Sequence, residues 1–544
     1  MSPPAMQRVS AKLSGAVAIT AALGGSPTVA HSAASAPPDS AWEMHCGDAM
    51  RRGVSASITP GGMGAAWTLS MDGQGRAITF PAGVTPVCTR DRVYAIGSVI
   101  VSAQKQFWLF AVDRRSGQLS WSRQITTPAT DSWSSPVIDG RNGAVITTTG
   151  KVVAAFDLVS GAPRWSVTLG RTIVNASAVI TDDLGLSNRL FITQYDGFGS
   201  LGALTCINVD PAYGVVNPFA PGQVLWSASI AGSSGNSPAY AAGVVYCASV
   251  GELDVYGQVQ AFDARAVSEP GPLWVQYVDG HNFFGGCTLR AGEDGLWLFA
   301  ATYAFSGGVE ASRLVKLNAL DGSVVWSTPC NRTASTPVVL EDGRLFLSGG
   351  VWGYGTAPSL EVFVDAGASV TRAWHSALST WQDADGDGVL DAGEFFAVGG
   401  WNQQPVYVAG SDELWIGTIP TSTETTGPYN ALHQLDAQGL PPKGAPGGPG
   451  DRSFVKSTGT GMGASPSAAD WNVYSTGTQG LRAIGVIPGR FDVNGDGRID
   501  VDDLHAWHQG TGARDCDMDG DVDAQDLSLL IVQVRRDELE GGRR

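Results

Sequence analysis

Two stretches of the chain read almost alike: AVDRRSGQLSW at residues 111–121 and AFDLVSGAPRW at residues 155–165. Each has an Asp after a run of apolar residues, closes a short turn on Gly and continues to a Trp. Asp and Gly are the residues that tight turns between antiparallel strands favour. Looser copies occur at residues 261–274 and 317–326. The pattern predicts a β-hairpin that recurs along the chain, so an internal repeat decides the fold class.

Two further features recur in phase with this hairpin. The tryptophans are Trp121, Trp165, Trp226, Trp274, Trp326 and Trp374. A small or polar residue, often followed by Pro-Val, marks the start of a strand at Thr85, Ser135, Ser177, Ser237, Cys287, Thr336, Gln404 and Ser465. We count eight such strand starts, which predicts eight repeats, each a small antiparallel sheet.

The two ends of the repeat series complement each other. Trp67 precedes the first strand start, so its strand has no repeat of its own. The last repeat, residues 466–486, has no Trp strand after it. We therefore expect the strand of Trp67 to complete the last sheet and close a ring, which leaves no long sheet edge exposed.

Composition agrees with a large β-rich protein. The 544 residues include 71 Gly and 29 Pro, 43% are hydrophobic and 16% charged. The glycines follow no collagen period, and no apolar run reaches the length of a membrane-spanning helix. A net charge of −17 argues against nucleic-acid binding, which needs clustered Lys and Arg.

The A-x-D-x-x-[ST]-G-x-x-x-W copies resemble the tryptophan-docking repeats of PQQ-like (quinoprotein alcohol dehydrogenase-like) β-propellers, over residues 60–488. The resemblance implies an all-β propeller of seven or eight blades, eight being preferred, in which each Trp stacks between neighbouring blades. It implies a fold and not an activity.

An acidic loop lies within the repeat series, at residues 381–396. It fits the EF-hand spacing, with Gly388 at the sharp turn, and Ca²⁺ prefers six to eight such oxygen ligands. Its expected ligands are Asp383, Asp385, Asp387, the backbone carbonyl of Val389, Asp391 and Glu394. We predict a calcium-stabilised insertion in a propeller loop.

Two more acidic loops follow at residues 489–540, each ending in Asp before a predicted helix. The expected ligands of the first are Asp492, Asn494, Asp496, the carbonyl of Arg498, Asp500 and Asp503. Those of the second are Asp515, Asp517, Asp519, Asp521, Asp523 and Asp526. The tandem resembles a type I dockerin, a small α-helical calcium module, which implies a cohesin-like protein or a cell-surface partner. Loop positions 10 and 11 read Val-Asp and Ala-Gln instead of Ser-Thr, which puts the cohesin in doubt.

The first thirty residues have the pattern of a secretory signal: Arg8 and Lys12, an apolar run, and small residues up to Ala30. We expect residues 31–59 to be a linker and the mature protein to be secreted (extracellular) or periplasmic, without a membrane span. Seven cysteines match no metal motif. One or two disulfides are compatible with export, and Cys46 with Cys88 is the pairing we considered.

No catalytic motif stands out. Quinoprotein dehydrogenases of this fold hold PQQ and a calcium ion, and many carry vicinal cysteines, which are absent from this sequence. Propellers also serve polysaccharide hydrolases and lyases, which use paired carboxylates. Candidate carboxylates follow no pattern: Asp210, Glu252, Asp254, Glu310 and Glu361. We predict three Ca²⁺, no PQQ, and a non-catalytic binding or scaffold protein linked to polysaccharide-degrading systems, with a propeller face that contacts a glycan or a protein; a PQQ-dependent dehydrogenase or a polysaccharide-active enzyme is the alternative.

Overall fold

The structure is a computed structural model. It describes residues 41–57, 65–81, 83–126, 134–195, 197, 201–253, 255–351, 356–376, 398–418, 431–437, 455–457, 465–469, 472–477, 479–485, 491–494, 499–512, 514–516 and 522–541. The proposed signal segment, residues 1–30, lies outside these residues.

Eight small antiparallel sheets form an eight-bladed β-propeller, as the repeat count predicted. The first four blades are blade 1 with β3 (Val87–Cys88), β4 (Arg92–Val101), β5 (Gln104–Asp113) and β6 (Leu119–Thr126); blade 2 with β7 (Val137–Asp139), β8 (Ala144–Asp157) and β9 (Pro163–Ile173); blade 3 with β10 (Val179–Ile180), β11 (Arg189–Gln194), β12 (Gly202–Asn208) and β13 (Val224–Ile230); and blade 4 with β14 (Ala239–Ala241), β15 (Val244–Glu252), β16 (Tyr256–Asp263) and β17 (Trp274–Asp279).

The other four blades follow the same order. They are blade 5 with β18 (Cys287–Gly292), β19 (Gly295–Ala301), β20 (Ser312–Asn318) and β21 (Val324–Cys330); blade 6 with β22 (Val338–Val339), β23 (Arg344–Gly349), β24 (Ser359–Asp365) and β25 (Val370–His375); blade 7 with β26 (Val406–Val408), β27 (Glu413–Thr418), β28 (Ala431–Asp436), β29 (Val455–Ser457) and the added β1 (Val54–Ser55); and blade 8 with β30 (Ser467–Ala469), β31 (Asn472–Gly477), β32 (Gly480–Gly485) and β2 (Ala65–Leu69).

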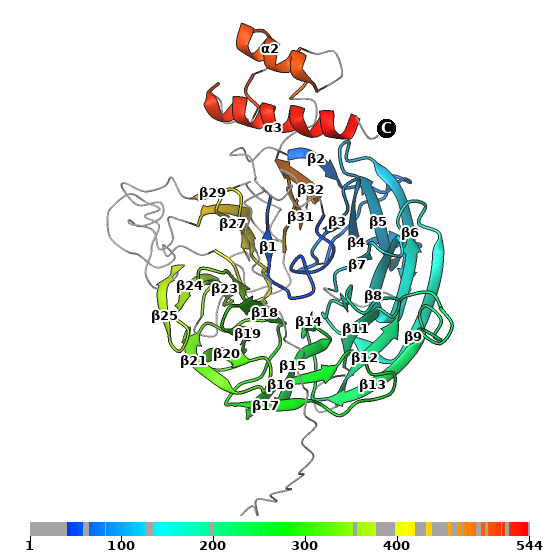
Figure 1. The fold of residues 1–544 in the computed structure, drawn as a ribbon, viewed down its shortest axis with the longest axis vertical. Coiled ribbons are helices and arrows are strands. Elements are labelled where there is room, and N and C mark those ends of the chain that lie inside the picture. The colour runs from blue at the N-terminus through cyan, green and yellow to red at the C-terminus, as the bar shows by residue number, and fades with distance from the viewer. Residues whose placement is uncertain are drawn as a thin grey trace, which may run out of the picture. The chain divides into compact units, whose positions relative to one another are not determined.

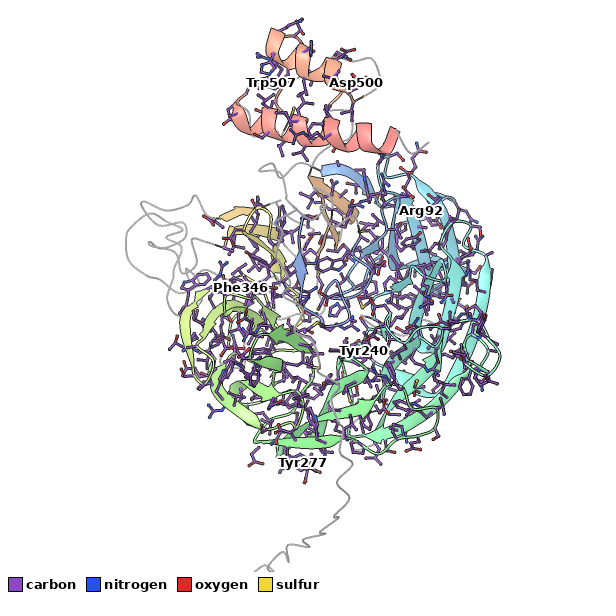
Figure 2. The ribbon with its side chains drawn as sticks, in the orientation of Figure 1. Arg92, Tyr240, Tyr277, Phe346, Asp500 and Trp507 are labelled. Atoms are coloured by element: carbon purple, nitrogen blue, oxygen red, sulfur yellow. The ribbon has the colours of Figure 1, made fainter. Side chains whose placement is uncertain are left out.

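The blades stand around one axis (Figure 1), with the first strand of each blade innermost. Tyr240 on β14 accordingly lies near the centre of the ring and Tyr277 on β17 at its outer edge (Figure 2). In blade 2, β8 takes the place of two strands, because its first half pairs with β7 and its second half with β9.

Blade 8 closes the ring with strands from both ends of the repeat series. β2 pairs antiparallel with β32, and Trp67 lies opposite Ala483. The predicted contribution of the N-terminal Trp strand to the last blade is therefore confirmed.

The repeat tryptophans join neighbouring blades. Each indole N–H in this set donates to the turn of the following blade: Trp67 to the Arg114 carbonyl (2.8 Å), Trp121 to that of Leu158 (3.3 Å), Trp226 to that of Ala266 (2.9 Å), Trp274 to that of Ala319 (3.0 Å) and Trp326 to the Asp365 carboxylate (2.9 Å). The turn Asp shapes the hairpin from within, as Asp113 Oδ1 accepts the N–H of Ser116 at 2.8 Å. The repeat motif therefore encodes both the hairpin and its contact with the preceding blade.

The residues that mark the strand starts form links around the axis. In each link a backbone N–H donates to the side chain of the next marker: Thr85 to Ser135 (2.9 Å), Ser135 to Ser177 (2.9 Å), Ser177 to Ser237 (2.9 Å), Thr336 to Gln404 (2.8 Å) and Gln404 to Ser465 (3.2 Å). This explains why small hydroxyl residues recur at these positions. In blade 5 the corresponding residue is Gly286, which has no side chain to offer.

Two helices follow the propeller in the chain, α2 (Val501–Gln509) and α3 (Ala524–Gly541). They share a small core of Phe491, Val493, Ala506, Cys516, Leu529, Leu530 and Val534. On α3, Leu529, Leu530 and Val534 are buried, while Leu527 and Ile531 are half-buried. Among the described residues, no helix has the length and apolar character needed to cross a bilayer.

Candidate functional site

The chain segment before the first blade lies inside the ring. We call residues 41–57 the axial segment. Its backbone pairs with the innermost strands of several blades: the Glu43 carbonyl accepts from Ile138 (2.7 Å), that of Ala49 from Tyr240 (2.7 Å), that of Met50 from Leu289 (2.8 Å) and that of Gly53 from Tyr407 (2.9 Å). The segment ends in β1, which pairs in parallel with β26. We expected this stretch to belong to a linker; instead its carbonyls fill hydrogen-bonding positions on the innermost strands.

Arg51 anchors the axial segment. Its side chain is fully buried, and burial lowers its pKa to about 10, so it stays cationic at neutral pH. The guanidinium donates to the carbonyls of Pro238 (2.9 Å), Ser177 (2.9 Å) and Ala178 (2.8 Å) in two neighbouring blades, and to that of His45 (2.7 Å). One side chain thus ties blades 3 and 4 to the segment.

Three described pockets border the axial segment. One of about 480 Å³ is lined by Met50, Arg52 and Val54 together with residues of blades 5 to 7, and one of about 260 Å³ by Glu43, Asp48 and residues of blades 2 and 3. The third, which we call the axial pocket, is small and polar. Its volume is about 30 Å³, and it is lined by His45, Asn175, Ser177, Ser237, Ser335, Asn402, Gln404, Ser465 and three small residues. His45 Nδ1 lies 3.0 Å from Thr85 Oγ1. Burial, together with the charge of Arg51, lowers the pKa of His45 to about 3, which keeps the ring neutral. No carboxylate is among the described lining residues of this pocket.

The disulfide that we considered is not formed. All seven cysteines lie in the described part of the chain, all are buried, and none forms a disulfide bond. Cys46 lies beside Arg51 and Thr336, while Cys88 on β3 pairs through its backbone with Trp42. Burial raises the pKa of the Cys46 thiol to about 12.

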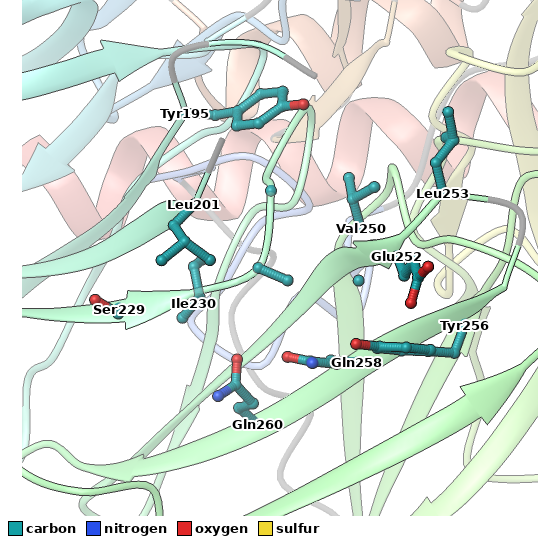
Figure 3. A pocket seen from close by; sticks show the side chains of 13 residues that line it. Tyr195, Leu201, Ser229, Ile230, Val250, Glu252, Leu253, Tyr256, Gln258 and Gln260 are labelled. Carbon is teal, nitrogen blue, oxygen red and sulfur yellow. The ribbon is translucent and has the colours of Figure 1, made fainter. Parts of the chain in front are cut away.

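A larger pocket lies between blades 3 and 4, which we call the interblade groove. Its volume is about 480 Å³. Its lining residues are Tyr195, Leu201, Ser229, Ile230, Ala231, Gly232, Val250, Gly251, Glu252, Leu253, Tyr256, Gln258 and Gln260. Figure 3 shows Gln258 and Gln260 between Leu201 and Ile230 on one side and Glu252 and Tyr256 on the other.

Two tyrosines border the interblade groove. The Tyr195 ring lies against Gly232, where an added Cβ would stand 2.8 Å from the ring, so glycine is required for this close approach. Burial raises the pKa of Tyr195, so its hydroxyl stays protonated. Tyr256 makes an edge-to-face contact with Tyr277, at 5.3 Å between ring centres. Tyr277 is 53% exposed, so the aromatic surface continues outward from the groove.

Gln260 departs from the repeat at its own position. It lies three residues before the turn Asp263. At this position four other blades carry the apolar residues Phe110, Ala154, Val315 and Val362, while blades 3 and 7 carry the polar residues Thr205 and His433. Gln260 is 6% exposed, and its Oε1 has no hydrogen-bond partner within the part of the chain that the structure describes. Our reading of the sequence missed this residue; the repeat register, if applied to each strand position, would have revealed it.

The predicted calcium ligands lie partly outside the described residues. This applies to the whole insertion loop, Asp383, Asp385, Asp387, Val389, Asp391 and Glu394, and to Asp496, Arg498, Asp517, Asp519 and Asp521. The described ligands are Asp492, Asn494, Asp500 and Asp503 in the first C-terminal loop, and Asp515, Asp523 and Asp526 in the second. Within the described ranges, no group of three or more Asp, Glu, His or Cys side chains is arranged for a metal ion.

The last residue of each C-terminal loop closes that loop in the same way. Asp503 accepts the N–H of Asn494 at 3.1 Å and that of Asp500 at 2.8 Å. Asp526 accepts the N–H of Cys516 at 2.5 Å and that of Asp523 at 2.8 Å. Both carboxylates are buried, and Asp500 also caps α2 through the N–H of Asp502 at 2.9 Å. In both loops position 12 accepts the N–H of position 9 and one N–H from the start of the loop, which is that of position 3 in the first loop and of position 2 in the second.

The candidate carboxylates have different surroundings. Asp210 accepts from Asn142 and Asn188 in a buried network, Glu252 lines the interblade groove, and Asp254 lies outside the described residues. Glu310 and Glu361 both accept from Arg372. Glu361 is fully buried, which raises its pKa to about 7, so it is not exposed to a substrate. Asp210 and Glu252 therefore lie apart from each other and from Glu310 and Glu361, which are neighbours bridged by Arg372.

No protein-family profile and no curated protein sequence matches this chain. Among solved structures, a europium-containing methanol dehydrogenase matches with a TM-score of 0.54 at 11% identity, over 80% of this chain and 90% of that chain. BamB from Moraxella catarrhalis matches with a TM-score of 0.46 at 14% identity, over 78% and 97%, and Sqt1 from Chaetomium thermophilum with 0.48 at 10%, over 78% and 98%. At such identities the likeness concerns the propeller fold alone.

The axial pocket does not fit PQQ, the cofactor of the dehydrogenases that share this fold. PQQ is a three-ring tricarboxylate, far larger than a cavity of about 30 Å³. The described lining residues are Ser, Asn, Gln, His, Gly and Ala, none of which supplies a carboxylate for a calcium ion beside the cofactor. We derive no reaction step through PQQ.

Proposed function

We propose that this chain is an exported, non-catalytic binding protein, in which the propeller carries the ligand and the C-terminal module attaches the protein to a partner. The observation that supports this best is the axial segment, because the chain's own residues 41–57 take up the channel around which the blades converge. The surface of the blades is open to a ligand, and so are the two larger pockets beside the axial segment.

Enzyme assays test the non-catalytic part of the proposal. The full-length protein would be incubated with PQQ and Ca²⁺ and assayed for dye reduction with alcohols and sugars, and separately for release of reducing or unsaturated ends from polysaccharides. We expect no turnover above that of the heat-denatured protein. Dye reduction that depends on added PQQ, or saturable cleavage of a polysaccharide, would overturn the proposal.

We also propose that three Ca²⁺ ions stabilise the protein, one in the insertion loop and two in the C-terminal loops. Carboxylate and amide oxygens at alternate loop positions are the donor set that Ca²⁺ prefers. The common closure of the two C-terminal loops by Asp503 and Asp526 supports a pair of equivalent sites. The remaining ligands would be those expected from the spacing.

The partner that we propose for the C-terminal module is a cohesin-like protein or another cell-surface protein, reached after export of the chain through its first thirty residues. A pulldown with immobilised cohesins, in calcium and after chelation, tests the attachment. We expect retention in calcium only, and reduced retention of the D503A/D526A double variant. Retention that chelation leaves unchanged would contradict a calcium-dependent module. N-terminal sequencing of the protein recovered outside the cell, expected to start after Ala30, tests the export.

A further inference from the structure

The interblade groove has the composition of a ligand site. We propose that it binds a neutral oligosaccharide segment, an inference that rests on the proposed binding function and names its ligand class. The pocket, of about 480 Å³, has the size typical of small-molecule sites and is more than ten times larger than the axial pocket. It therefore accommodates more than a single sugar ring.

The buried amide of Gln260 supplies the first argument. A buried polar atom without a partner is costly, by roughly 1–3 kcal/mol, so native proteins rarely keep one without a use. Gln260 Oε1 is such an atom and lines the groove, at a position where blades 5 and 6 carry Val. An acceptor at this place calls for a donor from the ligand, and a sugar hydroxyl provides one. Gln258, two residues away on the same strand, adds a second amide.

The tyrosines supply the second argument. The faces of sugar rings are rich in C–H groups and pack against flat aromatic side chains, while their hydroxyls point sideways to amides and carboxylates. Tyr256 borders the groove, and Tyr277 extends the aromatic surface beyond it; Tyr195 also lines the groove but is only 4% exposed. Leu201 and Leu253, which are 60% and 47% exposed, add apolar contact at its border.

The charge of the lining residues favours a neutral sugar over an acidic one. None of the thirteen described lining residues is Lys, Arg or His, and the one ionisable carboxylate among them is Glu252. A uronate or a sulfated sugar would bring a negative charge next to Glu252 without a cation to balance it, which is unfavourable. A neutral sugar meets no such repulsion, and Glu252 can accept hydrogen bonds from its hydroxyl groups.

Isothermal titration of the full-length protein with cellohexaose, xylohexaose, mannohexaose and hexagalacturonate tests the inference. We expect at least one neutral hexaose to bind and hexagalacturonate to bind more weakly. Gln260→Val, which restores the residue of blades 5 and 6, should weaken that binding at least tenfold without lowering the melting temperature. Tyr256→Ala should weaken it by a similar factor, while Tyr213→Ala, which alters an exposed tyrosine outside the groove, should leave it unchanged.

Each other outcome overturns the inference. If no neutral hexaose binds, or if hexagalacturonate binds most tightly, the ligand class is wrong. If a hexaose binds wild type and Q260V equally, the site lies elsewhere on the propeller, although the binding function stands. A peptide that competes for the groove while the sugars do not would assign it to a protein partner. The enzyme assays and the cohesin pulldown report on the proposed function independently of these results.

Discussion

The turn glycines of the repeat pack against the tryptophans of the preceding blade. An added Cβ at Gly161 would stand 2.6 Å from the Trp121 ring, and one at Gly117 would stand 2.4 Å from Trp67. Both glycines also have a positive φ, 67° at Gly161 and 70° at Gly117. Each of these positions therefore requires glycine for two reasons: the positive φ of its backbone and the close contact with the indole of the neighbouring blade.

Gly161→Ala separates these two requirements when it is compared with Gly185→Ala. Both glycines have a φ of 67°, but nothing lies within 4 Å of a Cβ at Gly185. We expect G185A to cost about 1 kcal/mol through backbone strain alone. G161A should cost roughly 1–3 kcal/mol more, because the methyl group displaces Trp121. Denaturant unfolding measures both, and equal losses would show that the indole does not depend on the glycine.

Glu361 predicts a pH dependence of stability. Burial is the main cause that raises its pKa, from 4.5 to about 7. Because its pKa is raised, Glu361 holds its proton more tightly in the folded state than in the unfolded state. The resulting contribution to the free energy of unfolding is fully present below pH 4.5 and is lost as the pH rises through 7. His375 nearby has its pKa lowered to about 4 by burial, so it stays neutral over this range.

Glu361→Gln mimics the protonated carboxyl group and should prevent the loss of stability at high pH. We expect wild type and E361Q to be similarly stable at pH 5, and E361Q to be more stable at pH 8, by an amount on the order of 3 kcal/mol. Thermal unfolding at the two pH values measures the difference. Glu310→Gln is the control, because Arg372 lowers the pKa of Glu310 and this group does not titrate in the range. A parallel response of E310Q and E361Q would contradict the assignment.

Among the elements, α2 and α3 depend on the loops before them. Asp503 joins the first loop to α2, because its two oxygens accept one N–H from the start of the loop and one from the helix N-cap. Asp526, in the first turn of α3, joins the second loop to its helix in a similar way by accepting from Cys516 and Asp523. The stability of each helix is thereby coupled to the conformation of its loop.

Asp503→Ala should loosen the first loop and α2 together. It removes a capping box and leaves two N–H groups without their acceptor, a cost of about 2 kcal/mol or more. Hydrogen exchange of peptides over residues 491–512 should become at least tenfold faster, in calcium-containing buffer. Asp502→Ala is the control, since Asp502 is an exposed neighbour in the same helical turn. Equal exchange in the two variants would show that Asp503 has no special part in closing the loop.

The whole molecule depends on contacts between distant parts of the chain. Arg51 reaches carbonyls 126, 127 and 187 residues away, and β2 pairs with a strand near the other end of the repeat series. The axial segment thus holds several blades at once, and the ring is closed by both of its ends.

Arg51→Ala should destabilise the entire propeller and not one blade. Four carbonyl groups lose their donor, and we expect a loss of about 3 kcal/mol or more. Arg52→Ala is a matched control next to it in the chain, because the Arg52 side chain is half exposed and pairs with Asp48 on the surface. Thermal unfolding, followed by near-ultraviolet circular dichroism of the tryptophans, measures both variants. A melting temperature of R51A equal to that of R52A would rule out an anchoring role.

The parts of this fold that could be predicted from the sequence are those encoded by short local motifs. The Asp, Gly and Trp of the hairpin lie within eleven residues, and the Thr85-Pro-Val type of strand start recurs in phase with them, so blade number and closure followed. The axial segment could not be predicted, because residues 41–57 carry no periodic pattern and their partners are scattered over the blades. Gln260 could not be predicted for a different reason. It is recognised only when residues at the same position of different blades are compared, and this comparison requires the strand register.

The pairing of β2 with β32 has a consequence for synthesis. Residue 485, the end of β32, leaves the ribosome about 420 residues after Ala65, which begins β2. At 5–20 residues per second, the Trp67 strand waits for roughly 20–80 s before its neighbour exists. During that time the Trp67 indole can already pack on the turn at Gly117 in blade 1, but the backbone edge of its strand has no neighbour to pair with. The ring can therefore close only after the last blade has been made.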